Sequence, residues 1–494
     1  MRRCPVVYEA NARLLLRALS AEHGRALTLS SIPDGYWQGL ADAGIDAVWL
    51  MGVWQRSSSA RRVALGVPGL RREFDHALPD WTEADVAGSP YAVYSYSLDA
   101  ELGGPEDLEA LRTRLSPFGL SLILDFVPNH VALDHPWVRT HPQRFVGAST
   151  LKLVELHPDW FYSPNGHGYV AHGRDPFFAP WTDTAQVNFF SEDLREALTQ
   201  ELLSIAEVCD GVRCDMAMLA LNRVFEGTWG EALGDVPRPR TEFWADAIGR
   251  VWKAHPGFVF LAEAYWGTGA ELRCLGFDYT YDKGLYDGLR WRDASAVRDR
   301  LAEESVDPDG WARFTENHDE ERAATAFGKD RSVAAATAVA TLPGLRLFHR
   351  GQEEGRTTRT PVQLIRERDE PADPDLRDFY NRLWRFVCRD VFHEGEWELL
   401  HAGRSGDGND SHEGILAWGW QLEGERCVVA INYSGSQAQA RIKLPDVGPD
   451  EGVVEYRDEL TGDCYTMDAA EIRDAGLYVD LSPWGCHILS MPRR

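Results

Sequence analysis

The 494-residue sequence is poor in positive charge, and this shortage limits its partners. Its 51 Lys and Arg residues face 77 Asp and Glu residues, so the formal net charge is −26. Recognition of phosphate groups needs a basic surface, which argues against nucleic acids and anionic lipids as partners. The composition favours a neutral substrate.

The sequence also lacks a long apolar run. No stretch has the roughly 20 apolar residues that a membrane span requires. Near the N-terminus, Glu9, Asn11 and Arg13 interrupt the apolar run that a signal peptide would need. We therefore expect a cytoplasmic protein without a membrane span.

Paired cysteines are absent as well. The eight cysteines, at 4, 209, 214, 274, 388, 427, 464 and 486, include no CxxC pair. This spacing indicates free thiols and argues against a disulfide scaffold or a structural zinc site. Stability must come from a large apolar core, for which 44% apolar residues are sufficient.

What the sequence does contain is an alternation of short apolar runs with helical patterns. The helical segments, such as PEDLEALRTRLSPFG, start with acidic or hydroxyl residues, and several end with Gly. Continuous apolar strands separated by helices are typical of an α/β fold with a parallel (β/α)8 TIM barrel. The eight runs lie near residue 6 and at 46–54, 120–127, 210–216, 258–266, 277–282, 312–319 and 345–351.

Two regions break this alternation. Residues 131–190 are too long for one strand–helix connection and are rich in His, Pro, Gly and aromatic residues, which predicts an inserted subdomain after the third strand. From about residue 396, short runs between turns predict a C-terminal antiparallel β-sandwich domain. We assign 1–130 and 191–395 to the barrel, 131–190 to the insertion and 396–494 to the β domain.

Four of the eight apolar runs finish on an acid, namely Asp125, Asp215, Glu263 and Asp319. Burying an acid is costly, and a barrel enzyme carries its active site at the carboxyl ends of its strands. Taken singly, each acid is also explained as a helix N-cap or as the partner of an arginine. Four acids in equivalent positions favour an active site.

Arg213 and Asp215 are two residues apart, so their side chains leave the strand on the same face. The guanidinium favours the ionised form of Asp215, which suits a nucleophile. Glu263 follows an apolar run, where desolvation raises the pKa of a carboxyl group and suits it as a proton donor. A retaining glycosidase needs one acid of each kind.

Four short motifs carry a resemblance to a known family. They are DFVPNH at 125–130, GVRCDMAML at 211–219, AEAYW at 262–266 and FTENHD at 314–319, and QVN at 186–188 is a weaker fifth match. In this order, at the ends of expected barrel strands, they resemble the motifs of the α-amylase family, glycoside hydrolase family 13. The resemblance covers essentially the whole chain.

The resemblance implies that Asp215 is the catalytic nucleophile, Glu263 the general acid and base, and Asp319 the stabiliser of the transition state. The other residues that it places at the donor sugar are Arg213, His130 and His318 as direct contacts, Tyr91 as the stacking ring beneath the sugar, and Asp125 as an organiser of Arg213.

Further residues are candidates for substrate binding from their chemistry alone. A polar cluster of His167, His172, Arg174 and Asp175 either lines a pocket or satisfies the turns of a loop. Aromatic side chains form platforms for sugar rings, with core packing as the alternative for each. The aromatic candidates are Trp160, Phe161, Tyr162, Trp181 and Trp266.

The sequence departs from many α-amylases after the nucleophile, where Met218 and Leu219 replace a Lys and a His that help to bind substrate and calcium. Asn129 matches a residue that often binds calcium in the family, but its usual partner is missing. We expect that no cofactor is required, and calcium stays open.

The leading hypothesis is a retaining hydrolase of short α-glucans or α-glucosides, with a neutral α-linked sugar as its partner. The alternative is a transglycosylase of the trehalose-forming, glucanotransferase or maltosyltransferase type, in which a sugar or phosphate takes the place of water. Glu320, directly after Asp319, resembles the pattern of trehalose-forming and maltosyl-transferring members. A maltosyl phosphate donor would need cations such as Arg350, Arg356 and Arg359. A noncatalytic sugar-binding protein, the third hypothesis, would be expected to have lost one of the three acids.

Overall fold

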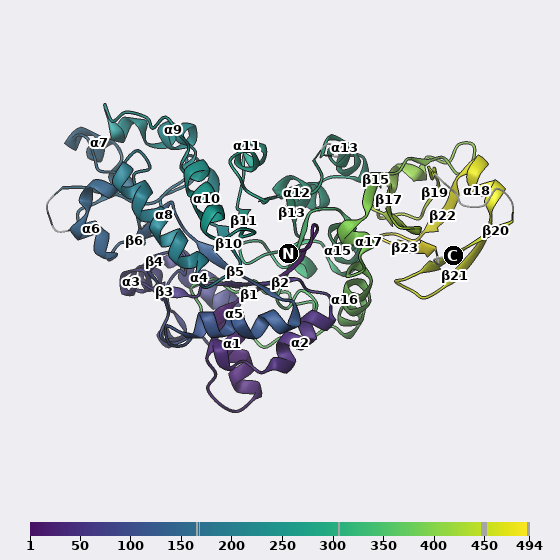
Figure 1. Ribbon diagram of the computed structural model, residues 1–494, viewed down its shortest axis with the longest axis horizontal. Coiled ribbons are helices and arrows are strands. Elements are labelled where there is room, and N and C mark those ends of the chain that lie inside the picture. The colour runs from purple at the N-terminus through teal and green to yellow at the C-terminus, as the bar shows by residue number, and fades with distance from the viewer. Residues whose placement is uncertain (165, 167, 305–306, 446–451, 492–494) are drawn as a thin grey trace.

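The computed structural model describes residues 1–164, 166, 168–304, 307–445 and 452–491. Figure 1 shows a barrel wrapped in helices, with the β domain at one end of the molecule, next to helices α16 (Pro374–Val387) and α17 (Val391–Glu394). The inserted segment lies at the opposite end. The site is therefore built on the barrel and on the segments that rise from it.

Eight parallel strands close into a barrel in the order β1-β14-β13-β12-β11-β10-β5-β2. Almost all of their residues are buried, because the barrel interior covers one face and the helices cover the other. Each predicted apolar run overlaps one of these strands, so the predicted fold class is confirmed. The strands are β1 (Val6–Asn11), β2 (Ala47–Met51), β5 (Ser121–Phe126), β10 (Gly211–Cys214), β11 (Val259–Ala262), β12 (Tyr279–Tyr281), β13 (Trp311–Arg313) and β14 (Leu345–His349).

The helices begin where the local sequence supplies a cap. The Ser191 hydroxyl accepts from the Leu194 N–H at the start of α8, and the Asp373 carboxylate caps α16, which begins at Pro374. Within the described residues, no helix is both long and apolar enough to cross a bilayer. The helices are α1 (Ala12–Glu22), α2 (Asp34–Asp42), α5 (Asp107–Leu115), α8 (Glu192–Ala206), α9 (Asn222–Leu233), α10 (Phe243–Ala254), α11 (Gly269–Cys274), α12 (Lys283–Trp291), α13 (Ala294–Glu304), α14 (Ala323–Ala326), α15 (Lys329–Thr341), α16 (Pro374–Val387) and α17 (Val391–Glu394).

Two long excursions leave the carboxyl ends of barrel strands. The predicted one lies between β5 and β10 and contains the small antiparallel pairs β6–β9 and β7–β8. The second, between β2 and β5, was not predicted, because its helical pattern resembles that of an ordinary barrel helix. The elements of the first are β6 (His130–Ala132), α6 (Pro136–Thr140), α7 (Leu151–Leu156), β7 (Phe161–Tyr162), β8 (Val170–Ala171) and β9 (Thr184–Gln186), and those of the second are β3 (Trp54–Arg56), α3 (Ser58–Gly66), α4 (Pro68–Ala77) and β4 (Val93–Leu98).

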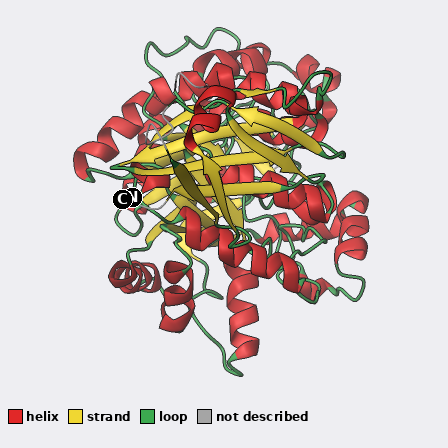
Figure 2. Ribbon diagram, turned by 90° about the vertical axis from the view of Figure 1, so that its right-hand side faces the viewer, coloured by secondary structure: helices red, strands yellow, loops and turns green. Residues whose placement is uncertain are grey.

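The C-terminal domain consists of two antiparallel sheets with an apolar cluster between them, ordered β15-β17-β18-β23-β20-β21 and β16-β19-β22. Figure 2 looks onto this domain. Trp418 and Trp420 both donate hydrogen bonds to Thr341 of α15, so they attach the domain to the barrel. Its elements are β15 (Glu396–Leu399), β16 (Ala402–Gly403), β17 (Ile415–Leu422), β18 (Glu425–Asn432), β19 (Ala438–Ile442), β20 (Val453–Asp458), β21 (Cys464–Asp468), α18 (Ala469–Ala475), β22 (Leu477–Leu481) and β23 (Cys486–Met491).

Candidate active site

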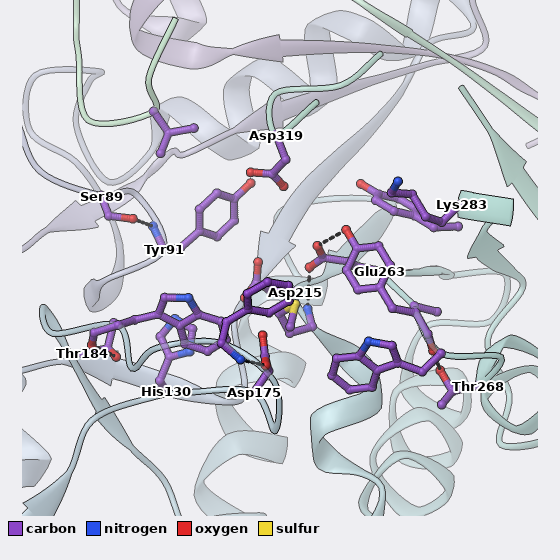
Figure 3. Close-up of a pocket in the computed structure, with 18 of the residues that line it drawn as sticks. Ser89, Tyr91, His130, Asp175, Thr184, Asp215, Glu263, Thr268, Lys283 and Asp319 are labelled. Atoms are coloured by element: carbon purple, nitrogen blue, oxygen red, sulfur yellow. Dashed lines mark hydrogen bonds between the residues drawn. The ribbon is translucent and has the colours of Figure 1, made fainter. Parts of the chain in front are cut away.

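A cavity of about 1040 Å³ opens at the carboxyl ends of the barrel strands. Its walls come from loops that follow the strands and from both excursions (Figure 3). Three of the residues that the sequence assigned to the site, Asp125, Arg213 and His318, lie buried beneath this cavity. Six others line it, namely Tyr91, His130, Asp215, Glu263, Trp266 and Asp319.

The three proposed catalytic acids come together because their strands belong to one barrel. Asp215 directly follows β10 and Glu263 directly follows β11, and these two strands pair side by side. Asp319 comes from the loop after β13. Figure 3 shows the three carboxylates facing the same space.

Arg213 contacts two of these acids at once. Its Nη1 donates to Asp215 Oδ1 at 2.5 Å, while its Nη2 lies 2.7 Å from Glu263 Oε2 without the alignment of a hydrogen bond. The side chain is fully buried. The sequence predicted only the pair with Asp215, because the proximity of Glu263 depends on how β10 and β11 pair.

The acids differ in acidity. Burial raises the pKa of Glu263 to about 7, although the charge of Arg213 opposes this shift. Burial acts in the same direction on Asp319, but the charge and hydrogen bond of His318 outweigh it and lower the pKa of Asp319 to about 2. At neutral pH, Asp319 is ionised, while Glu263 retains a substantial protonated fraction.

Asp215 departs from the simple expectation. Burial raises the pKa of Asp215 above its ordinary value, and the guanidinium of Arg213 works against this shift without cancelling it. The guanidinium of Arg213, two residues away in the sequence, predicted an ionised Asp215. Desolvation in the barrel opposes this effect and depends on the tertiary structure.

Backbone and side-chain donors hold Glu263 in place. Its Oε2 accepts from the Met216 N–H at 2.7 Å, and its Oε1 accepts from the Tyr265 hydroxyl at 2.8 Å. Met216 adopts a left-handed conformation with φ of 44°, which is rare for a residue other than Gly. Such strain is typical of functional sites, where the surrounding structure holds it.

Asp125 stabilises the neighbouring strand end. Its carboxylate accepts from Trp49 Nε1 at 3.0 Å and from the Gly52 N–H at 2.7 Å. Arg213, which the resemblance named as its partner, influences the pKa of Asp125 only through charge. The direct hydrogen bonds of Asp125 therefore organise the end of β2.

His318 connects Tyr91 to Asp319. Its Nε2 lies 2.9 Å from Asp319 Oδ2 and 2.9 Å from the Tyr91 hydroxyl. The Tyr91 ring stacks on the imidazole with centroids 5.3 Å apart. Tyr91 also lines the cavity.

The neighbourhood of Asn129 does not fit a calcium site. Gln186 Nε2 donates to Asn129 Oδ1 at 3.0 Å, and the Asn129 amide donates back to Gln186 at 3.3 Å. Calcium prefers a cage of oxygen ligands that usually includes carboxylates. In the described part of the chain, no cluster of three His, Cys, Asp or Glu residues is arranged to hold a metal ion. We derive no step through a metal.

His130 is the neutral histidine of the site. Burial lowers its pKa to about 4, and a hydrogen bond with the Tyr91 backbone opposes this shift only weakly. Its ring lies against Trp181, with centroids 5.1 Å apart. At neutral pH it therefore contributes a polar but uncharged surface to the cavity.

An aromatic group that the sequence analysis did not assign borders the cavity beside Trp266. Phe178 lines the cavity and is 72% exposed, and the exposed Phe177 meets the Trp266 ring edge-on at 4.9 Å. Asp175 accepts from both phenylalanine N–H groups and so fixes this turn. Trp266 itself has a φ of 57°. The structure thus holds exposed rings in place at the cavity mouth.

The other aromatic candidates divide into two groups. Trp181 lines the cavity, as Trp266 does. Trp160 instead packs beneath the Arg174 guanidinium at 3.7 Å, and Tyr162 stacks on His172. Phe161 is buried. Core packing therefore accounts for Trp160, Phe161 and Tyr162.

The polar cluster of the insertion mainly supports its loops. His172 Nδ1 contacts the Thr184 carbonyl at 3.0 Å, and Arg174 Nη2 donates to the Thr228 carbonyl at 2.9 Å. Of this cluster, Asp175 reaches the cavity. His167 lies outside the described residues.

Several residues that line the cavity or lie beneath it were not predicted, and Tyr265 and Tyr281 are the two that line it. Glu9 lies in the apolar run VVYE and carries the same signal as the four acids, so it could have been found. Tyr265 lies two residues after Glu263, a weaker signal. Trp49 and Tyr281 look like core residues in the sequence, because an aromatic residue in a strand is usually packing.

With this geometry in view, the chain was compared with known proteins. The family described as "Alpha amylase, catalytic domain" matches residues 36–191. Alpha-amylase 3 of Dictyoglomus thermophilum is 25% identical over 58% of this chain and 58% of its own length. Alpha-amylase MalA of Haloarcula japonica is 24% identical over 85% of this chain and 54% of its own length.

A transferase is similar to the same degree. The alpha-1,4-glucan:maltose-1-phosphate maltosyltransferase of Bifidobacterium animalis is 24% identical over 81% of this chain and 52% of its own length. The chain spans only about half the length of these relatives. A noncanonic maltogenic alpha-amylase of Thermotoga neapolitana shares the fold, with a TM-score of 0.67 and 19% identity over 99% of both chains.

The eight-stranded barrel, its insertion after the third strand and the C-terminal β domain define a (β/α)8-barrel protein with the same fold as this maltogenic alpha-amylase. Residues 36–191 of the chain match the catalytic domain of the α-amylase family, and the chain is similar to α-amylases and to a maltosyltransferase at 24–25% identity.

Arg213 contacts both Asp215 and Glu263, so its removal should lower the stability of the protein in a pH-dependent way. Arg213→Met should lose about 3–5 kcal/mol of the free energy of unfolding at pH 8, because two buried carboxylates lose their cation. Without this cation their folded-state pKa values rise further, so stability should return as the pH falls and the carboxylates take up protons.

Urea unfolding at pH 5 and pH 8 measures this effect. Arg223→Met is the matched control, because its ion pair with Glu271 is half exposed and should contribute about 1 kcal/mol or less. If Arg213→Met lost the same free energy of unfolding at both pH values, this cation would not be the group that stabilises the two buried carboxylates.

Proposed function

We propose that the protein is a retaining glycosidase that cleaves α-glucosidic bonds of short α-glucans or α-glucosides through a covalent intermediate on Asp215. The observation that carries this proposal is the convergence of Asp215, Glu263 and Asp319 on one cavity with unequal acidities. Retaining hydrolysis needs a carboxylate nucleophile and a protonated acid side by side.

The reaction then has two steps. First, the Asp215 carboxylate attacks the anomeric carbon as the glycosidic C–O bond breaks, and Glu263 gives its proton to the departing oxygen. Next, ionised Glu263 takes a proton from water, and the water oxygen attacks the same carbon and releases Asp215. Two inversions at one carbon retain the α configuration.

The surrounding groups support these roles. Arg213 donates a hydrogen bond to Asp215 and so favours its anionic form, while Glu263 lacks an aligned bond from this guanidinium. Asp319 is ionised and faces the cavity, where its charge stabilises the positive charge that develops on the sugar. Tyr91 and His130 form the polar wall against which the donor sugar binds.

A neutral donor is favoured over a sugar phosphate. Arg350 and Arg356 both pair with Glu367 at 2.8 Å, and Arg359 pairs with Glu73 at 3.0 Å. These arginines are the cations that the sequence offered for a phosphate donor, and each already has an acidic partner. This pairing supports a neutral α-linked sugar as the substrate.

The leaving group faces the loop that follows Glu263, because a proton donor must contact the oxygen that it protonates. Trp266 lies on this loop, and Phe178 borders the same cavity from the insertion. Exposed aromatic rings bind the apolar face of a sugar ring by stacking. We infer that the second sugar binds there.

A transglycosylase is the second candidate. Two relatives with the name maltosyltransferase match most of this chain. The aromatic side chains of Trp266 and Phe178, which border the cavity, would hold an acceptor sugar in place of water. Glu320, the residue after Asp319, lies 3.5 Å from Lys283, whose side chain borders the cavity and offers donors to acceptor hydroxyls.

Product analysis by NMR tests the proposal. Purified protein is incubated with maltose, maltotetraose, sucrose, trehalose and maltose 1-phosphate, with Asp215→Asn as the blank. Free sugars that appear first as the α-anomer support the retaining hydrolase. Longer or rearranged sugars indicate the transglycosylase, and turnover of the phosphate donor alone would contradict the neutral donor. Activity of the blank would remove Asp215 as nucleophile.

The pKa of Glu263, at about 7, predicts the alkaline limb of the pH profile. We expect kcat/KM for an oligosaccharide to fall as the pH rises through this value, because the proton donor is lost. Glu263→Gln should lower kcat about 100- to 10,000-fold and abolish this limb. A variant that keeps the limb would assign it to another group.

The aromatic side chains of Trp266 and Phe178 predict that the loss of kcat/KM on removal of one ring depends on the leaving group. Trp266→Ala should lower kcat/KM for maltose roughly 10-fold, because stacking contributes on the order of 1.5 kcal/mol. For α-glucosyl fluoride, whose leaving group has no ring, the change should stay within about twofold, since nothing stacks. Trp291→Ala, at a side chain 67% exposed, is the control. Equal losses for both substrates would contradict a leaving-group site at Trp266.

A further inference from the structure

Glu9 is a buried carboxylate that the proposed reaction does not use. It lies on β1, in register with Trp49 of β2 and His349 of β14, and its side chain is fully buried. A carboxylate in such a place is costly unless a partner compensates its charge. Its contacts therefore decide what it does.

The partner of Glu9 is His318. Glu9 Oε1 lies 2.6 Å from His318 Nδ1 and 3.4 Å from the His318 N–H, so it holds both the ring and the backbone of this residue. Glu9 Oε2 is buried without a hydrogen-bond partner among the described residues. The imidazole is thus the only side chain of the described structure that hydrogen-bonds this carboxylate.

The other ring nitrogen of His318 faces the catalytic site. Nε2 lies 2.9 Å from Asp319 Oδ2, so one imidazole stands between a buried carboxylate and a carboxylate of the cavity. Both ring nitrogens have an anionic acceptor, an arrangement that only a doubly protonated ring satisfies. Burial lowers the pKa of His318, but Asp319 and Glu9 outweigh it and raise the pKa to about 10.

Packing fixes the plane of this ring. Trp49 lies edge-on to it at 5.5 Å, and Tyr91 stacks on its face. Other charged and titratable groups also face it: Asp125 and Asp215 act on it through charge, and Arg322, His349, Arg350 and Glu367 line a small cavity with it. Among the carboxylates of the described residues, Glu9 and Asp319 are the two within hydrogen-bond distance of the ring.

We propose that Glu9 is a positioning residue, which acts through His318 to hold the carboxylate of Asp319 where the positive charge of the transition state develops. This inference rests on the proposed function, because Asp319 matters in this way only in a glycosyl transfer. Glu9 does not touch the sugar. Glu9 contacts His318, and His318 contacts Asp319, so Glu9 acts on Asp319 through the imidazole.

The charge of Glu9 is the part that the proposal requires. Glu9→Gln keeps the size of the side chain and an oxygen that accepts from Nδ1, but removes the charge. His318 should then lose its second proton at a lower pH, and its bond to Asp319 loses charge assistance. Glu9→Asp keeps the charge and should preserve the titration better than Glu9→Gln.

Histidine NMR of the protein tests whether the charge of Glu9 acts on His318. The signal of His318, labelled at carbon Cε1, is identified by its loss in His318→Asn and is followed against pH. In the wild type we expect a charged ring beyond pH 9, and in Glu9→Gln a pKa that is lower by at least about one unit. An ordinary wild-type pKa near 6.5 would overturn the proposal, even if Glu9→Gln does not fold.

Enzyme kinetics test whether His318 in turn holds Asp319 in place for catalysis. At pH values above the lowered pKa, Glu9→Gln should lose up to about 100-fold in kcat with little change in KM, because Asp319 is held less well. The loss should shrink as the pH falls and His318 regains its proton. A purely structural role would lower the amount of folded enzyme and leave the pH profile unchanged.

Glu353→Gln is the matched control, because this glutamate accepts from Tyr8, the neighbour of Glu9 on β1, and lies outside the proposed site. It should leave the His318 titration and the pH profile unchanged. Wild-type titration and kcat in Glu9→Gln would overturn the proposal. If the wild type turns over none of the glycosides, the proposed function fails, whereas the NMR titration still reports on the contact between Glu9 and His318.

Discussion

The buried guanidinium of Arg213 is the interaction on which the site depends. Two carboxylates at the ends of adjacent strands, Asp215 and Glu263, occupy the dry base of the cavity only because this cation lies between them. Trp49, Tyr91 and Tyr281 surround the guanidinium at 5.3 to 5.7 Å, so aromatic faces complete its environment. A buried charge network of this kind is stable only when each member keeps its partner.

His318 does for the third acid what Arg213 does for the other two. Arg213 is a permanent cation shared between Asp215 and Glu263, and burial still raises the pKa of both carboxyl groups. A histidine between two acids, Glu9 and Asp319, acts on a single carboxylate of the cavity and lowers its pKa. Glu263 and Asp319 thus differ in protonation within one cavity, and acid-assisted glycosyl transfer requires such a difference between carboxyl groups.

The predictable part of the fold follows from local patterns. Strands buried on both faces need continuous apolar runs, so all eight barrel strands were visible in the sequence, as was the end of the barrel where short strands replace helices. The excursion between β2 and β5 was not visible, because α3 and α4 carry the same pattern as a barrel helix. What those helices cover depends on tertiary packing.

The sequence by itself determined the barrel, the four acids at strand ends and the resemblance to the α-amylase family, because strand periodicity and short motifs are local properties. Only the tertiary structure decided that Arg213 also contacts Glu263, that Glu9 from the first strand bonds His318 from the seventh strand's loop, and that exposed aromatic rings border the cavity. Such contacts join residues far apart in the chain, and the acidity of each group depends on the desolvation and neighbouring charges that barrel closure creates.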